Sequence, residues 1–236
     1  MIEKTEAIVL NKISYTDNKK IVTLFSKSSG KKKLVVTFSK SKKNKNNYFQ
    51  IFQILNVEFS AKNNSEFISL KESSLNTPLN GIWSNYDKLS IVFFISGMLN
   101  NIIYNNLIDE ELYNFVKMSI ILLEKCEHPA NFHIAFLVNL AKYIGIMPIN
   151  NFSKTEKFFD FRKGRFIALF DKNFTLNLKE SENLHNFLNE GMSGFVKINL
   201  NKKNRNDLIS GILNFYRFHF PNIDTSSYEI LKEMYK

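Results

Sequence analysis

The sequence is poor in the residues that build disulfide-stapled or loosely linked proteins. Its 236 residues include one cysteine, Cys126, which excludes a disulfide within the chain and a cysteine-rich zinc site, and fits a reducing compartment. Gly (8) and Pro (4) are scarce, so we expect no long flexible linkers. The apolar runs are too short to span a bilayer, and the N-terminus MIEKTEAIVLNK lacks the apolar stretch of a signal peptide. We therefore expect a cytosolic protein.

The sequence also lacks the residue patterns of a catalytic centre. Its four histidines form no His-x-x-x-His or His-Glu-x-x-His pair, and the nearest two, His128 and His133, are five positions apart. There is no glycine-rich phosphate loop, and Gly191 and Gly194 in EGMSG predict a helix end and a turn. The acids at 109–111 indicate a helix start rather than metal ligands. We expect no enzyme, no metal and no other cofactor.

Positive charge is present in excess and is concentrated in one part of the chain. The net charge is +10, and the abundance of Asn, Lys, Ile and Phe is typical of an AT-rich genome, which accounts for some lysine everywhere. However, residues 1–57 hold three acids (Glu3, Glu6 and Asp17) and twelve lysines: 4, 12, 19, 20, 27, 31, 32, 33, 40, 42, 43 and 45. A genome bias does not concentrate charge. We predict that this segment binds a polyanion; a merely solvated basic face is the alternative.

Residues 5–75 have the pattern of β structure. Five runs rich in Val, Ile, Phe and Thr are separated by polar breaks, and the stretch 48–60 is one of the predicted strands. SSGK predicts a tight hairpin turn with Gly30 at positive φ. Five short strands without a helical stretch indicate a small closed barrel, and the OB-fold is the commonest five-stranded barrel.

From Trp83 onward the apolar residues recur at the spacing of a helix. The fold class is therefore α+β: an OB-fold barrel domain at 1–80 and a mostly helical domain at 81–236, with a β-hairpin at about 157–170 whose tip is RKG. One face of the first helix would carry Leu89, Val92, Phe93, Ser96, Leu99 and Ile103. Further helices are expected from Asp109 as N-cap to about 126, from 129 to 145, and at 180–190, 204–219 and 226–235.

The basic segment is the candidate nucleic-acid site. Lysines on a strand and a loop would contact phosphates in a manner that ignores base sequence, because lysine supplies a point charge and all four arginines lie in the helical part. The candidate lysines are Lys19, Lys20, Lys31, Lys32, Lys33, Lys40, Lys42, Lys43 and Lys45. The aromatic residues among them could stack on bases, although strand alternation assigns Phe49 or Phe52 to the core. The others are Tyr15, Phe38 and Tyr48.

Four stretches, in the right order along the whole chain, resemble the RecO-type DNA repair and recombination mediators of bacteria. TEAIVLNKISYTDNKKIVTLFSKSSGKKKLVV is similar to the opening of that family, and LVNLAKYIGIMPI to its L-G-Y-x-P helix end. FDFRKGRFI resembles the family's F-D-x-x-x-G-x-F hairpin. FYRFHFPNIDTSSYEIL resembles its carboxyl end, where Ser227, Glu229 and Leu231 match an S-x-E-[VI]-L helix. Each motif is weak by itself, and the ordered set is specific.

The resemblance implies a function as well as a fold. Members of the family bind single- and double-stranded DNA, anneal complementary strands, and act with RecR to load recombinase on DNA coated by single-stranded DNA-binding protein. They also hold the acidic, apolar tail of that coating protein in the helical lobe. Lys142 and Arg217, each beside aromatic residues, are candidates for holding the tail; both could instead merely cap or solvate helix ends. The resemblance implies a bacterial cytoplasmic, nucleoid-associated protein.

Two features depart from the family. Many members have a four-cysteine zinc site around the hairpin, and this chain has only Cys126, upstream of it. We expect a short hairpin packed by Phe158, Phe159, Phe161 and Phe166 instead. The family's K-G-A-R after the third strand is replaced by TFSK, so Lys40 takes the arginine position. An RNA- or ribosome-associated OB protein and an enzyme with a dispersed site stay open as alternatives.

Overall fold

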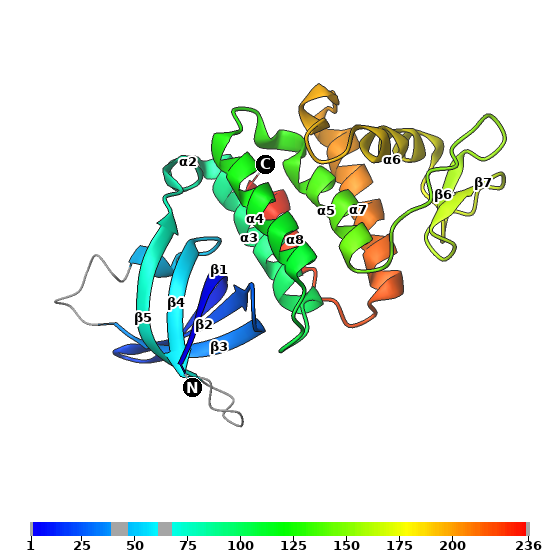
Figure 1. Ribbon diagram of the computed structural model, residues 1–236. Coiled ribbons are helices and arrows are strands. Elements are labelled where there is room, and N and C mark those ends of the chain that lie inside the picture. The colour runs from blue at the N-terminus through cyan, green and yellow to red at the C-terminus, as the bar shows by residue number, and fades with distance from the viewer. Residues whose placement is uncertain (1, 39–46, 61–67, 235–236) are drawn as a thin grey trace. The chain divides into compact units, whose positions relative to one another are not determined.

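The structure is a computed structural model that describes residues 2–38, 47–60 and 68–234 (Figure 1). The chain forms two compact units, residues 1–125 and 126–236, and each is described by itself. The domain ranges expected from the sequence, 1–80 and 81–236, stay predictions.

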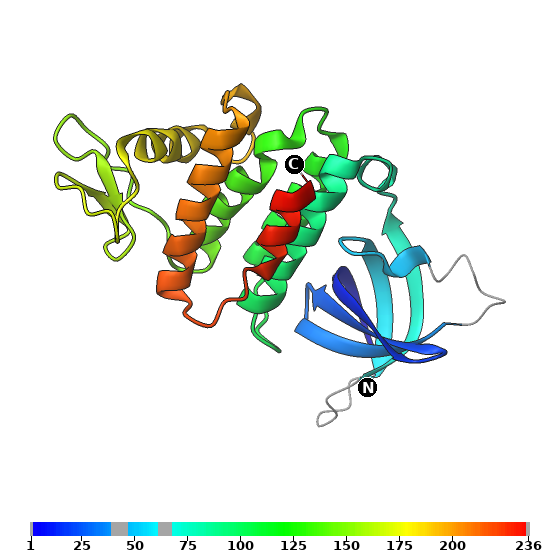
Figure 2. The ribbon, with the colours of Figure 1, turned by 180° about the vertical axis from the view of Figure 1, so that it is seen from behind.

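The first unit begins with a closed five-stranded barrel. The strands are β1 (Ile2–Thr16), β2 (Lys19–Ser26), β3 (Gly30–Thr37), β4 (Ile54–Ser60) and β5 (Ile68–Thr77), in the order β1-β2-β3-β5-β4. All neighbours are antiparallel except β3 and β5, which pair in parallel and close the barrel. Figures 1 and 2 show the strands curving around one another from opposite sides. The predicted OB-fold barrel is confirmed.

The barrel is filled by alternate residues of its strands. Its buried core includes Val9, Val22, Leu24, Leu34 and Val57. Because side chains alternate between the two faces of a strand, Val22 and Leu24 point inward while their neighbour Thr23 does not belong to this core. Gly30 begins β3 at φ +70°, as predicted for the hairpin turn.

The segment between β3 and β4 is the part of the barrel that was predicted wrongly. A strand was expected from residue 48, but Asn47–Phe49 forms a 3-10 helix, η2, and β4 begins only at Ile54. Phe49 and Phe52 are 2% and 1% exposed. Phe52 has φ +67°, and its N–H donates to the Val9 carbonyl at 2.7 Å. Phe49 therefore packs into the barrel core, and the backbone turn at Phe52 replaces the extended strand that was expected.

Among its described residues, the first unit also contains the helices α2 (Asn80–Trp83), α3 (Tyr86–Ile102) and α4 (Glu110–Lys125). The carboxylate of Asp109 accepts from the Leu112 N–H at 2.8 Å, which confirms this residue as the N-cap of α4. On α3, the expected single apolar face is too narrow. Phe93 is 44% exposed, and Ile91, Phe94, Ile95 and Met98 are buried instead, because α3 is covered on more than one side.

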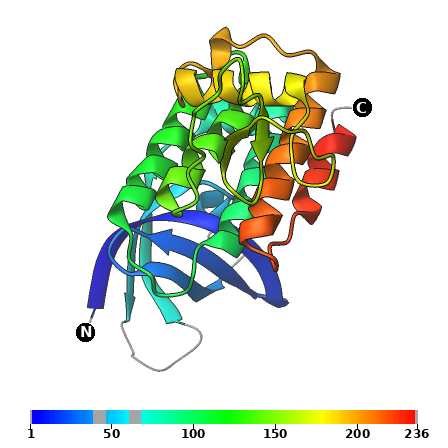
Figure 3. The ribbon, with the colours of Figure 1, turned by 90° about the vertical axis from the view of Figure 1, so that its right-hand side faces the viewer.

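The second unit is helical and carries the short hairpin. Its elements are η3 (Pro129–Asn131), α5 (Phe132–Tyr143), β6 (Phe158–Asp160), β7 (Arg165–Ile167), α6 (Leu178–Glu190), η4 (Phe195–Lys197), α7 (Lys202–His219) and α8 (Ser226–Met234). Figure 3 shows the hairpin in front of α6 and α7. Gly145 and Gly191 follow the ends of α5 and α6 at positive φ, as the sequence predicts. The helices and the hairpin tip are confirmed. None of the described helices has the length and apolar character needed to cross a membrane.

Candidate nucleic-acid interface

The barrel has opposite charge on its two pairs of strands. β2 and β3 carry five lysines and no acid. β4 and β5 carry two acids, Glu58 and Glu72, and one lysine, Lys71. Glu58 in addition forms an ion pair with Lys4 of β1 at 2.5 Å. A polyanion is therefore attracted to the side of β2 and β3 and repelled from the side of β4 and β5.

Lys19 and Lys20 lie at the beginning of β2. Their ladder partners are Thr37 and Val36 at the end of β3. Lys19 is exposed, and Lys20 is half-buried with its ammonium 5.2 Å from the centre of the Phe38 ring. A cation at this distance from a ring face is held by the ring's quadrupole. The barrel thus presents two lysines of β2 beside the residue that follows β3.

Lys31, Lys32 and Lys33 lie at the other end of the same ladder, and two of them are anchored within the unit. The ammonium of Lys31 donates to the Asn100 carbonyl at 2.8 Å, and that of Lys32 to Oδ1 of Asn106 at 2.6 Å. Burial, and then the charge of Lys33, lowers the pKa of Lys31. The sequence did not indicate these contacts, because the acceptors lie about seventy residues further along. Lys31 and Lys32 serve partly to attach β3 to the last turn of α3 and to the segment that follows it.

Four of the predicted lysines lie outside the described residues: Lys40, Lys42, Lys43 and Lys45. Their assignment to the interface stays a prediction from the sequence.

The aromatic residues that were candidates for stacking on bases differ in how deeply they are buried. Phe49 and Phe52 are buried and cannot stack on a base. Phe38 and Tyr48 are half-buried against the barrel core, and the Phe38 ring meets the Phe49 ring edge-on at 5.8 Å. Tyr15 is exposed on β1. Only Phe38, Tyr48 and Tyr15 are therefore accessible to a base.

The two candidates for holding an acidic tail lie in the second unit. The ammonium of Lys142, at the end of α5, is 5.9 Å from the centre of the Tyr143 ring. Arg217, near the end of α7, donates to Oδ1 of Asn214 at 3.0 Å and to Oγ1 of Thr225 at 2.5 Å. The aromatic residues expected beside them are mainly internal: Phe136, Phe215 and Tyr216 are buried, whereas Phe218 is exposed. Arg217 therefore ties α7 to the segment before α8.

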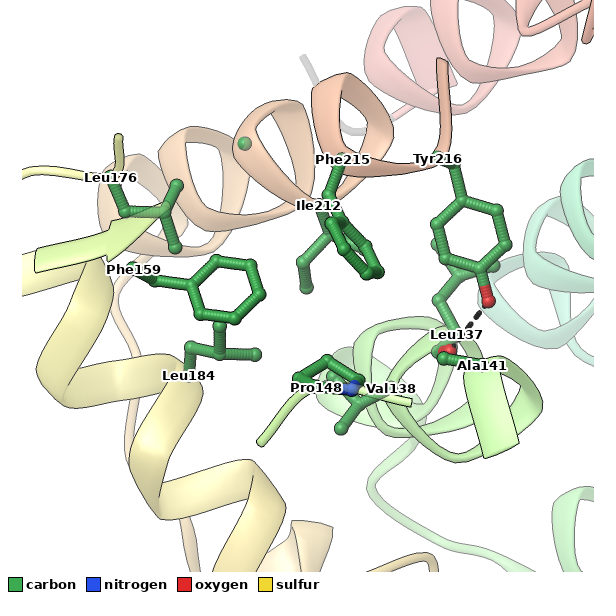
Figure 4. A pocket seen from close by; sticks show the side chains of 11 residues that line it. Leu137, Val138, Ala141, Pro148, Phe159, Leu176, Leu184, Ile212, Phe215 and Tyr216 are labelled. Carbon is green, nitrogen blue, oxygen red and sulfur yellow. Dashed lines mark hydrogen bonds between the residues drawn. The ribbon is translucent and has the colours of Figure 1, made fainter. Parts of the chain in front are cut away.

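An apolar pocket lies between α5, α6, α7 and the hairpin (Figure 4). Its walls include Leu137, Phe159, Leu184, Ile212 and Phe215. The accessible space amounts to about 10 Å³, which is at the lower limit of what a single water molecule needs. The Tyr216 hydroxyl donates to the Leu137 carbonyl at 2.7 Å and closes one end (Figure 4). The pocket is a packing gap in the core of the unit.

The hairpin is organised by a carboxylate and a cluster of rings. Asp160, whose side chain is fully buried, accepts from the N–H groups of Arg162 at 2.8 Å and Lys163 at 3.0 Å, and pairs with the Arg162 guanidinium at 2.8 Å. Burial by itself would raise the pKa of Asp160, but the hydrogen bonds from Arg162 and Lys163 outweigh it and lower the pKa. Phe159 and Phe166 are buried edge-to-face at 5.3 Å. No group of three metal-ligating side chains occurs within the described part of the chain.

Comparison with known proteins relates the whole chain to one family. Residues 1–78 match the family model "Recombination protein O N terminal", and residues 84–228 match "Recombination protein O C terminal". The chain is 31% identical to the DNA repair protein RecO of Flavobacterium psychrophilum over 98% of both chains. It is 31% identical to that of Porphyromonas gingivalis over 94% of both, and 25% identical to that of Bacteroides fragilis over the full length of both.

Proposed function

The chain belongs to the RecO family of DNA repair proteins, and from this premise we propose that it is a mediator that binds single- and double-stranded DNA without sequence preference and anneals complementary strands. In the same role it would act with a RecR-type partner and help to load recombinase on DNA coated by single-stranded DNA-binding protein. The role in DNA repair follows from the family; the DNA forms, the annealing and the partners are the proposal.

The observation that carries the proposal is the acid-free basic surface of β2 and β3. Its five lysines are Lys19, Lys20, Lys31, Lys32 and Lys33. Lysine attracts the phosphate backbone as a point charge and does not fork onto a base edge as arginine does. Binding through phosphates also leaves the pairing edges of the bases accessible, which annealing requires. The basic surface thus fits a protein that holds any strand and allows it to find its complement.

We place the acidic tail of the coating protein on the second unit, with Lys142 as its main cation. Lys142 is exposed at the end of α5 beside the half-buried Tyr143 ring. Arg217 would contribute less, because its guanidinium already donates to Asn214 and Thr225. An exposed cation and a carboxylate attract one another by only about 1 kcal/mol, so we expect Lys142→Gln to weaken tail binding only several-fold.

A titration of fluorescent single-stranded DNA, with and without a synthetic tail peptide, tests the proposal. We expect binding that weakens steeply with salt, since each phosphate contact contributes about 0.7 to the log–log slope for single strands. Annealing of complementary strands coated by the cognate coating protein should be faster with the protein than without it. An RNA oligomer of the same sequence serves as the control. Tight RNA binding without DNA annealing would instead indicate an RNA-associated protein.

A further inference from the structure

The second half of β1 pairs only with β2, and β2 pairs along its other edge with β3. β1 pairs with β4 only as far as Ile8, opposite Ile54, whereas its pairing with β2 continues to Thr16, opposite Lys19. We call residues 11–22 the β1–β2 arm. Within the described residues, the arm extends past the point where the pairing of β4 with β1 ends, so β1 forms an edge of the sheet there.

One face of the arm continues the interior of the barrel and carries two lysines. Lys12 is opposite Val22, and Lys20 is opposite Ser14 on β1 and Val36 on β3. Val22 and Val36 belong to the barrel core. Since cross-strand partners share a face, Lys12, Ser14 and Lys20 lie on the face of these valines. Lys12 and Lys20 are diagonal neighbours on this face, a relationship that separates two residues by about 7–8 Å.

These two neighbouring lysines have no carboxylate partner in the described parts of the chain. Neither takes part in an ion pair of the described residues. Burial, and then the charge of Lys20, lowers the pKa of Lys12. A half-dehydrated cation beside a like charge is unfavourable, and an anion bound between the two would relieve both effects.

Phe38 holds Lys20 at this position. Its N–H donates to the Asn18 carbonyl at 2.8 Å, which fixes the residue against the turn between β1 and β2. Its ring meets the buried Phe49 ring at 5.8 Å and lies 5.2 Å from the Lys20 ammonium. The Lys20 ammonium is therefore held by the Phe38 ring, which in turn packs against the buried Phe49 ring.

We propose that Lys12 and Lys20, with Phe38 as a positioning residue, form a subsite for one phosphodiester group of a nucleic-acid strand on the inner face of the β1–β2 arm. Two ammonium groups on a diagonal can each reach one of the two non-bridging oxygens, and the Ser14 hydroxyl on the same face can donate to either. The proposal rests on the nucleic-acid binding proposed above and adds Lys12, which lies outside the dense lysine run, to the residues that make it.

The test compares Lys12→Gln, Lys12→Arg and Lys71→Gln with the unchanged protein. Lys71 is an exposed lysine of β5 and controls for loss of one charge from the barrel. The probes are an oligothymidylate and an abasic deoxyribose-phosphate oligomer of the same length. We expect Lys12→Gln to weaken both probes several-fold and to lower the log–log salt slope by about 0.7. Lys12→Arg should retain the slope, and Lys71→Gln should leave it unchanged.

Three results would overturn the subsite: an unchanged slope in Lys12→Gln, an equal loss in Lys71→Gln, or a loss for the oligothymidylate alone. If the unchanged protein bound neither probe, the proposed function would fail before the subsite was tested. If a variant does not fold, the subsite can still be tested by a measurement on the unchanged protein. In NMR of 13C-methylated lysines, the pKa of Lys12 should rise when the abasic oligomer binds; a constant pKa contradicts the subsite.

Discussion

The ammonium of Lys117 on α4 lies 2.8 Å from both carboxylate oxygens of Glu6 on β1. The Tyr113 hydroxyl, one turn earlier on α4, donates to the same carboxylate at 3.0 Å, and the Glu6 side chain is only 17% exposed. The Glu6 carboxylate is thus largely removed from water and accepts its hydrogen bonds from two side chains of α4. This relationship joins α4 to the barrel and explains why the first compact unit extends to residue 125.

Lys117→Met should therefore destabilise the first unit. It leaves a largely buried carboxylate with a single neutral donor, and we expect a loss of about 2 kcal/mol in the free energy of unfolding. Chemical denaturation followed by the fluorescence of Trp83, the single tryptophan, reports on this unit. Lys27→Gln is the control, because its ion pair with Glu110 is exposed and screened by solvent, so its loss should cost far less. Equal losses in the two variants would contradict the assigned role of Glu6.

Gly30→Ala should be far more damaging than the same change at Gly145. Both glycines have positive φ, which costs an alanine about 1 kcal/mol. A Cβ on Gly30 would also lie 2.3 Å from the Leu107 carbonyl oxygen, whereas Gly145 has open space around that position. We expect a loss of about 3 kcal/mol for Gly30→Ala and about 1 kcal/mol for Gly145→Ala. The same denaturation measurement, supplemented by hydrogen exchange on α5 for Gly145, would refute this if the order were reversed.

His133 should make the second unit less stable in acid. Burial, and then the charge of Arg205, lowers the pKa of His133 from 6.5 to about 3. Below pH 6.5, His133 binds a proton in the unfolded chain but stays neutral in the folded chain. The stability that this residue contributes is therefore complete above pH 6.5 and is lost as the pH is lowered towards 3. The slope in this window is about 1.4 kcal/mol per pH unit.

Hydrogen exchange of the α5 amides from about pH 7 to about pH 5 measures this dependence. His133→Met should remove most of the slope, whereas His128→Asn, at an exposed position just before η3, should keep it. A slope that survives His133→Met would assign the acid sensitivity to other groups.

The hairpin should depend on Asp160 and be indifferent to chelators. Asp160→Asn removes the charge that holds the Arg162 guanidinium and two N–H groups, so we expect the hairpin turn to open more often. Exchange of the Gly164 amide, which donates to the Asp160 carbonyl at 2.9 Å, reports on the turn. Arg165→Gln, which breaks the more exposed pair with Glu156, is the control.

Thermal unfolding in the presence of a chelator tests the expectation that the protein contains no zinc. A strong chelator should leave the midpoint of thermal unfolding unchanged, because a structural zinc site needs about four Cys or His ligands and the chain has one cysteine. Stoichiometric zinc in carefully purified protein, or a midpoint that falls with chelator, would show that this expectation is wrong.

Local chemistry explains why so much of the fold could be predicted. The N-cap at Asp109, the positive φ of Gly30, and the helix ends at Gly145 and Gly191 each depend on residues within one turn. Alternation with period two marked the barrel strands, and a spacing of three to four marked the helices. The prediction failed at residues 48–53 because the burial of Phe49 in the barrel core and the positive φ of Phe52 depend on tertiary packing, which outweighs the β propensity of this stretch.

The sequence by itself determined which parts of the chain form strands and which form helices, and to which family the chain belongs. It also showed that lysine is concentrated in the first quarter of the chain. These depend on composition and on neighbours along the chain. Only the tertiary structure decided how individual lysines are placed: Lys31 donates to Asn100, 69 residues away, whereas Lys12 and Lys20 are diagonal neighbours on one face of the β1–β2 arm. The physical reason is that burial and charge compensation arise between residues distant in sequence, and no local pattern records which of them will meet.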